Sequence, residues 1–275
     1  MRIARKTALV LGLATLLLLL PGIRAGAVTA ARSVKFPCKT VGTASLDPIV
    51  NPDGSPSAHE HVFFGNRGVP LGVRDYEAAI EEGTSCTFAG DTASYWRPTL
   101  FDANGTPVAA KNVVYYDRMT SQRIVAFPPD FGEIFGANRG LFSPKQRSYY
   151  GWNCDNREPL SRSFASVDCR SYSSSSNVLT FRAFSPFCWD GVVPASRDYG
   201  SHVFYPPNYP TSATCPAGSI VLPRLRVNVN FATKYLPNGR LSSDAPGEHG
   251  ESAHTDFWNT WQQGALEGLV ETLNG

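Results

Sequence analysis

The stretch SIVLPRLRVNVNF, residues 219–231, gives one of the clearest strand signals in this chain of 275 residues. Valine and isoleucine recur in it, and β-branched residues favour the extended backbone of a strand. Other stretches rich in β-branched or aromatic residues lie before it, at 113–116, 123–127, 178–184 and 202–205. Paired prolines between such stretches disfavour long helices. The sequence therefore predicts a mostly β protein with long loops.

Helical signals are limited to two segments. Residues 75–82 favour one short helix, and residues 260–273 favour a helix near the carboxy terminus, with Asn259 or Thr260 as its N-cap. The predicted fold is a disulfide-tied β-sandwich, or a related β-rich fold, with long loops and a short C-terminal helix.

The chain has an even number of cysteines, namely Cys38, Cys86, Cys154, Cys169, Cys188 and Cys215. Their spacing matches no compact zinc signature, so we expect structural disulfides formed in an oxidising compartment. Closeness along the chain favours the pairs Cys154–Cys169 and Cys188–Cys215, which leaves Cys38 for Cys86.

Residues 1–30 have the features of a secretory signal peptide, with basic residues ahead of the apolar run at 8–20 and small residues after it. The alternative is an uncleaved amino-terminal anchor. Residues 31–275 are predicted to form a single β-rich extracellular domain with no segment apolar enough to cross a membrane. Export therefore places the mature protein outside the cell or at the cell wall, and its oligomeric state stays open.

Net charge limits the classes of partner. The leader carries four positive charges, and their removal from a chain of formal charge +2 leaves a mature chain of −2. The body has no basic stripe of the kind that contacts a phosphate backbone. Nucleic acid is therefore excluded as an expected partner.

Histidine is scarce, and four of the five histidines lie beside acids or amides. His59 and His61 are two residues apart, as are His254 and Asp256, and on a strand such pairs point to the same face. His202 is isolated in the chain. We predict one polar pocket whose candidate catalytic residues are His59, His61, His202, His254, Asp256, Asp47 and Asp190.

Several phrases occur in an order that is informative as a set: Asp47-Pro48-Ile49-Val50, Ser57-x-His59-x-His61, Tyr95-Trp96-x-Pro98, Cys188-Trp189-Asp190-Gly191, Ser201-His202-Val203 and His254-x-Asp256-Phe257. Together they resemble the secreted domain-of-unknown-function family nineteen-ninety-six of fungi and actinobacteria. The resemblance covers nearly all of the mature chain. It implies export and contact with wall polysaccharide, but no established reaction.

The first functional hypothesis is an enzyme that acts on extracellular polysaccharide. Histidine titrates near ambient pH and suits proton transfer, whereas glycoside hydrolysis commonly uses two carboxylic acids. A lyase needs a base and a group that holds a uronate carboxylate, for which Asn51 and Arg97 are candidates. Trp96, Trp189 and Trp258 are candidate faces for stacking on sugar rings. A hydrolase or a lyase is therefore expected.

Two other hypotheses stay open beside a purely structural hydrogen-bonded network. One is a non-catalytic carbohydrate-binding or wall-associated domain. The other is a metalloprotein, because imidazoles with a carboxylate form a common ligand set for zinc, copper or iron. Its candidate ligands are His59, His61, His202 and His254. No cofactor is firmly indicated, and a divalent metal is the alternative.

Overall fold

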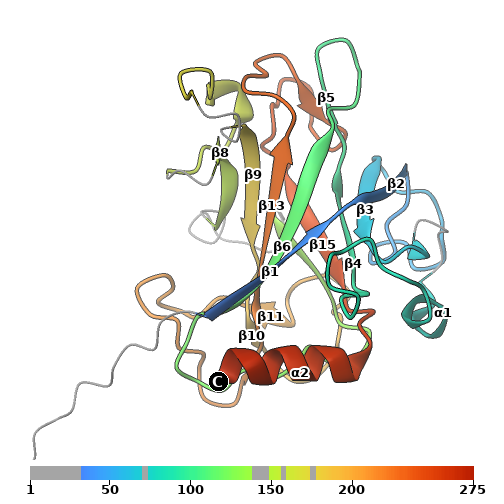
Figure 1. Ribbon diagram of the computed structural model, residues 1–275, viewed down its shortest axis with the longest axis vertical. Helices are drawn as coiled ribbons and strands as arrows, with labels where there is room; N and C mark the ends of the chain where they lie inside the picture. The colour runs from blue at the N-terminus through green and yellow to red at the C-terminus, as the bar shows by residue number, and fades with distance from the viewer. Residues whose placement is uncertain (1–31, 70–73, 138–148, 156–158, 174–177) are drawn as a thin grey trace, which may run out of the picture.

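A computed structural model describes residues 32–69, 74–137, 149–155, 159–173 and 178–275. The predicted signal peptide lies outside these residues. The described chain is mostly β, with two five-stranded sheets and a C-terminal helix, as the sequence predicts (Figure 1). Among the described residues, no helix is long and apolar enough to span a membrane.

The first sheet has the order β1-β6-β13-β9-β8, and all of its neighbouring strands are antiparallel. Its strands are β1 (Arg32–Cys38), β6 (Ala110–Arg118), β8 (Tyr150–Cys154), β9 (Leu179–Phe184) and β13 (Arg224–Phe231). Alternate residues of β6 and β13 are buried and directly paired, as Val114 is with Val227. This alternation sends one side of the sheet into the core.

The second sheet has the order β2-β3-β4-β15-β7. Its strands are β2 (Thr40–Ala44), β3 (His61–Gly65), β4 (Ser94–Pro98), β7 (Gly132–Gly136) and β15 (His254–Trp258). Side chains from both five-stranded sheets meet in the larger hydrophobic core, which includes Tyr95 and Phe257 from this sheet and Tyr116 from the first. The two sheets therefore pack as a sandwich.

The other face of the second sheet is also covered. Phe63, Trp96 and Trp258 form a smaller core there with residues of the loop after β2 and of α1 (Tyr76–Ile80). Because neighbouring residues of a strand point to opposite faces, β3, β4 and β15 each contribute an aromatic side chain to both cores. This sheet is thus buried on both sides.

Shorter elements complete the fold. The three-stranded sheet has β10 (Cys188–Trp189) between β11 (Val203–Phe204) and β12 (Ile220–Val221), and β5 (Leu100–Phe101) pairs with β14 (Arg240–Leu241). A 3-10 turn, η3, spans Phe164–Ser166. Helix α2 (Gln263–Asn274) buries Leu266, Leu269, Val270 and Leu273, the spacing of an amphipathic helix.

Two predictions about elements are wrong. Residues 123–127 form no strand, although the Val125 N–H donates to the Val221 carbonyl. Helix α2 begins beyond the predicted caps, because Asn259 donates to the Phe127 and Pro128 carbonyls and Thr260 donates to the Thr92 carbonyl. The three predicted disulfides are confirmed, as Cys38–Cys86, Cys154–Cys169 and Cys188–Cys215.

Candidate functional site

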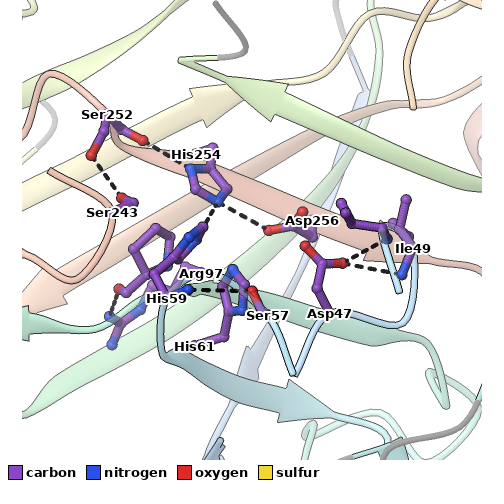
Figure 2. A network of polar contacts seen from close by, with 12 residues as sticks. Asp47, Ile49, Ser57, His59, His61, Arg97, Ser243, Ser252, His254 and Asp256 are labelled. Atoms are coloured by element: carbon purple, nitrogen blue, oxygen red, sulfur yellow. Dashed lines mark hydrogen bonds and ion pairs between the residues drawn. The ribbon is translucent and has the colours of Figure 1, made fainter. Parts of the chain in front are cut away.

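The second sheet brings three histidines together on the face turned away from the first sheet. His61 opens β3, and His254 opens β15, so both share the face of Phe63 and Trp258. His59 lies in the loop just before β3. Figure 2 shows the three rings gathered with Asp256 and Asp47 nearby. The i, i+2 spacing thus places His254 and Asp256 on one face of β15, whereas His59 reaches the same place from a loop and not from a strand.

The ring nitrogens of these histidines converge. Nε2 of His59 lies 3.3 Å from Nε2 of His254, and the ring centroids of His59 and His61 are 4.3 Å apart. One ligand nitrogen from each of the three rings lies within 4.8 Å of the others. We call this set, His59, His61 and His254, the histidine cluster.

Backbone carbonyls fix the tautomer of two of the rings. Nδ1 of His61 donates to the Leu46 carbonyl at 2.7 Å, and Nδ1 of His254 donates to the Ser252 carbonyl at 2.8 Å. A carbonyl oxygen only accepts, so in the neutral ring the proton is on Nδ1 and Nε2 keeps its lone pair. Nε2 of His61 is buried and has no hydrogen-bond partner. Nε2 of His61 is therefore a free acceptor, whereas Nε2 of His254 accepts from the Nε2–H of His59 at 3.3 Å.

The electrostatics of the cluster disfavour positive imidazoles in the ion-free protein. Burial, and then the neighbouring His254 and His59, lower the pKa of His61 to about 2. Burial and His59 lower the pKa of His254 to about 4, and burial lowers the pKa of His59. At neutral pH the three rings are accordingly neutral.

Two carboxyl groups lie beside the histidine cluster. Oδ2 of Asp256 is 3.8 Å from Nε2 of His254, and both Asp256 oxygens are buried without a hydrogen-bond partner. Burial and the nearby Asp47 raise the pKa of Asp256 well above its ordinary value. Burial also raises the pKa of Asp47, although the Val50 and Ile49 N–H groups donate to it. The site thus combines the unpaired Nε2 lone pair of His61 with the unpaired carboxyl group of Asp256.

A hydrogen-bonded loop holds the Ser252 carbonyl in place. The Ser252 hydroxyl donates to Oδ1 of Asp244 at 2.6 Å and lies 2.6 Å from the Ser243 hydroxyl. Oδ2 of Asp244 accepts the N–H groups of Gly250 and Leu241. Sequence reasoning missed Leu46, Ser252 and Asp244. The two carbonyls leave no signal in a sequence because every residue has one.

His202, the fourth predicted histidine, is placed elsewhere. Its Nδ1 accepts the Ser196 N–H at 3.3 Å, and its ring packs against Phe131 at 5.0 Å. Asp190 lies with it and accepts the Val192 N–H. None of the contacts that the described residues make with His202 involves the histidine cluster. The pocket predicted from four histidines therefore contains three.

The predicted substrate-binding residues are mostly unsuited to that role. Trp96 and Trp258 are fully buried in the smaller core, so the prediction that they stack on a sugar is wrong. Arg97 points to the opposite face of β4, where its guanidinium lies 5.0 Å from the Phe231 ring, so it does not face the cluster. Asn51 donates to the Ser55 and Pro56 carbonyls within its own turn. Trp189 is half-buried and donates to the Val193 carbonyl.

The donor set and its spacing fit a metal ion. Nitrogen ligands of one tetrahedral zinc ion are about 3.3 Å apart, given a Zn–N distance of about 2.0 Å, which matches the His59–His254 separation. A ligating histidine commonly donates its other N–H to a carbonyl or carboxylate, as His61 and His254 do. A divalent cation would also satisfy the buried carboxyl group of Asp256.

Comparison with known proteins gives one result that bears on identity. No curated protein and no solved structure matches the chain. The profile of one family matches residues 47–261, more than half of the chain and a span that includes the whole histidine cluster. The chain belongs to the family described as Domain of unknown function (DUF1996).

Proposed function

We propose that the chain is an exported metalloprotein that acts on extracellular polysaccharide. Its ligands for one divalent transition-metal ion are Nε2 of His59, His61 and His254, with the Asp256 carboxylate beside them. The observation that carries the proposal is the convergence of these nitrogens while carbonyls hold the Nδ1 protons of two rings.

The residues of the chain prepare this site in three ways. The carbonyls of Leu46 and Ser252 orient the imidazoles before any ion binds. Burial keeps those rings neutral and therefore able to ligate. Asp256 supplies a negative charge that becomes favourable once a cation is present, because opposite charges attract strongly where water is excluded.

Access to the site is from the side of His59. His61 is fully buried, whereas His59 and His254 are half-buried. When bound, the ion would polarise a substrate oxygen and lower the pKa of water. Hydrolysis or elimination is the class of reaction that we propose.

Polysaccharide is proposed on grounds of compartment. Three disulfides indicate an oxidising environment, which supports the predicted secretion, and polysaccharides are the main polymers outside many cells. Two of the three tryptophans predicted to stack on sugar rings are buried, which removes sugar-stacking faces from the enzyme and from the alternative of a non-catalytic carbohydrate-binding domain alike.

Metal content tests the centre directly. The amide of asparagine can donate where Nδ1 does, but it has no counterpart of Nε2, so His59→Asn, His61→Asn and His254→Asn remove a ligand with little other change. We expect about one zinc, cobalt or copper ion per wild-type chain by elemental analysis, and at least about tenfold weaker binding in each variant. His202→Asn is the matched control and should bind like the wild type.

Two results would contradict the centre: a wild-type chain that takes up none of these ions, or a His202→Asn chain that loses them as the others do. The activity is tested separately, by mass spectrometry of products from a panel of wall polysaccharides. Product formation should require the ion, stop with a chelator and stop in His59→Asn. A metal-loaded protein that binds polysaccharides but releases no product would reject the catalytic part.

A further inference from the structure

A second site lies toward the other end of β2 and β3. The cavity there has a volume of about 770 Å³, within the usual range of ligand pockets. It is lined by the Cys38–Cys86 disulfide and by residues of β1, β2, β6 and β13, and it shares no residue with the histidine cluster. Any ligand it binds is therefore separate from the metal.

The cavity is positively charged. Three of its lining side chains are the cations Lys39, Arg67 and Lys111, and none of the lining residues is acidic. All three cations are exposed, and none has an ion pair with an acid among the residues that the structure describes. The cavity therefore favours an anion.

Two of these charges are brought close by strand pairing. Cys38, the last residue of β1, pairs with Asn112 of β6, so Lys39 and Lys111 are the chain neighbours of one directly paired couple. Like charges that lie near one another repel. An anionic group between them would offset this repulsion.

The walls of the cavity are preformed. Segment 84–87 is joined to the end of β1 by the disulfide and by the bonds Lys39 N–H to Ser85 O and Thr87 N–H to Pro37 O. Nε of Arg67 donates to the Thr84 carbonyl, which directs that guanidinium. A ligand would meet groups that are already ordered, which lowers the entropy lost on binding.

The uncharged residues of the lining indicate what kind of molecule bears the anionic group. The hydroxyls of Thr40, Thr84 and Thr87 line the cavity and can hydrogen-bond to sugar hydroxyls. Ser85 and Asn112 also line it, but they are already bonded within the protein and help to hold its walls. The volume is far greater than a free inorganic anion needs. We propose that this cavity binds a short segment of an anionic polysaccharide, with its carboxylate or sulfate groups held by Lys39, Lys111 and Arg67. The site goes beyond the metal centre and does not depend on it.

Isothermal titration calorimetry tests the proposal with oligogalacturonate, a sulfated oligosaccharide of similar length and a neutral cello-oligosaccharide. Lys39→Gln and Lys111→Gln should each weaken binding of the anionic probe by about tenfold or more, because each removes a charged hydrogen-bond donor. Lys35→Gln is the matched control, since Lys35 is exposed on β1, just before Lys39 in the chain, carries the same charge and does not line the cavity. The control should bind like the wild type.

The two anionic probes distinguish a carboxylate from a sulfate as the preferred group. The proposal would be overturned if neither anionic probe bound, or if the neutral oligosaccharide bound as tightly as they do. It would also be overturned if Lys35→Gln weakened binding as much as Lys39→Gln and Lys111→Gln. Inorganic sulfate that binds as tightly as the oligosaccharides would also overturn it, by showing a simple anion site. The same titration on chelator-treated protein should be unchanged, so a failure of the metal centre is recognised separately.

Discussion

Glu133 is a carboxyl group enclosed in the larger core. It lies in β7 opposite Phe257 and is fully buried. Burial raises its pKa well above its ordinary value, although the Ser185 side chain partly opposes the shift. The folded protein therefore keeps this carboxyl protonated at pH values where the unfolded chain releases the proton.

This burial predicts how stability changes with pH. Because the folded state holds one more proton, the free energy of unfolding falls as pH rises above about 4.3, by about 1.4 kcal/mol per pH unit until the folded pKa is reached. Glu133→Gln does not titrate, so its stability relative to the wild type should increase from pH 5 to pH 7 in guanidinium unfolding. Exposed Glu267→Gln is the control. Parallel pH curves for Glu133→Gln and the wild type would contradict this account.

The histidine cluster shows what residue-level reasoning reached and where it stopped. The same-face rule holds for His254 and Asp256, which lie on β15, because it needs only local spacing. His59 does lie beside His61, but from the loop before β3. It could not place His202, whose position depends on how a loop packs against Phe131. Nor could it distinguish a buried tryptophan from an exposed one, because burial is decided by partners distant in the chain.

At the scale of elements, the loop between β14 and β15 fixes the start of β15, an inner strand of the second sheet. Asp244 accepts four hydrogen bonds there, from the N–H groups of Leu241, Gly250 and Ser252 and from the Ser252 hydroxyl. It touches no proposed ligand. It orients His254 only through the Ser252 carbonyl, which makes it a positioning residue.

Asp244→Asn replaces one accepting oxygen by a donor and should loosen the Ser252 carbonyl, which orients His254. We expect metal affinity to fall by about 10- to 100-fold, the usual effect of losing an outer-shell partner, measured by competition with a chromophoric chelator. Asp102→Asn is the matched control, because Asp102 caps a turn in the same way through the Asn104 and Thr106 N–H groups. Equal metal affinity in the two variants would show that Asp244 has only a structural role.

Elements were predicted best where local and tertiary preferences agree. The stretch 219–231 does form strands, but it serves two sheets, because Pro223 lies between β12 and β13 and has no N–H for a ladder. Helix α2 was predicted near the carboxy terminus, whereas its start was missed because the candidate capping side chains bond to other segments. Boundaries of this kind depend on contacts that no local pattern contains.

At the scale of the whole molecule, the disulfides close loops of different length. Cys38–Cys86 spans 48 residues of sequence and Cys154–Cys169 spans 15. By the loop-entropy argument, replacing the first pair by alanine should reduce the free energy of unfolding by about 4 kcal/mol and the second by about 3 kcal/mol. Guanidinium unfolding measures both.

The two disulfide variants should also differ in binding. Only the Cys38–Cys86 variant removes a wall of the positively charged cavity, so only it should weaken binding of oligogalacturonate in the calorimeter. If the Cys154–Cys169 variant loses binding equally, the effect would come from general loosening of the sandwich.

The separation of 195 residues between His59 and His254 has a consequence for timing. His59 and His61 leave the ribosome early, and His254 and Asp256 leave it almost at the end of synthesis. A nascent chain therefore lacks the complete set of proposed donors. The proposed ion would then be acquired only after β15 has been inserted between β4 and β7. If the chain is exported unfolded, that metal would come from outside the cell, and the supply there would decide which ion the proposed site holds.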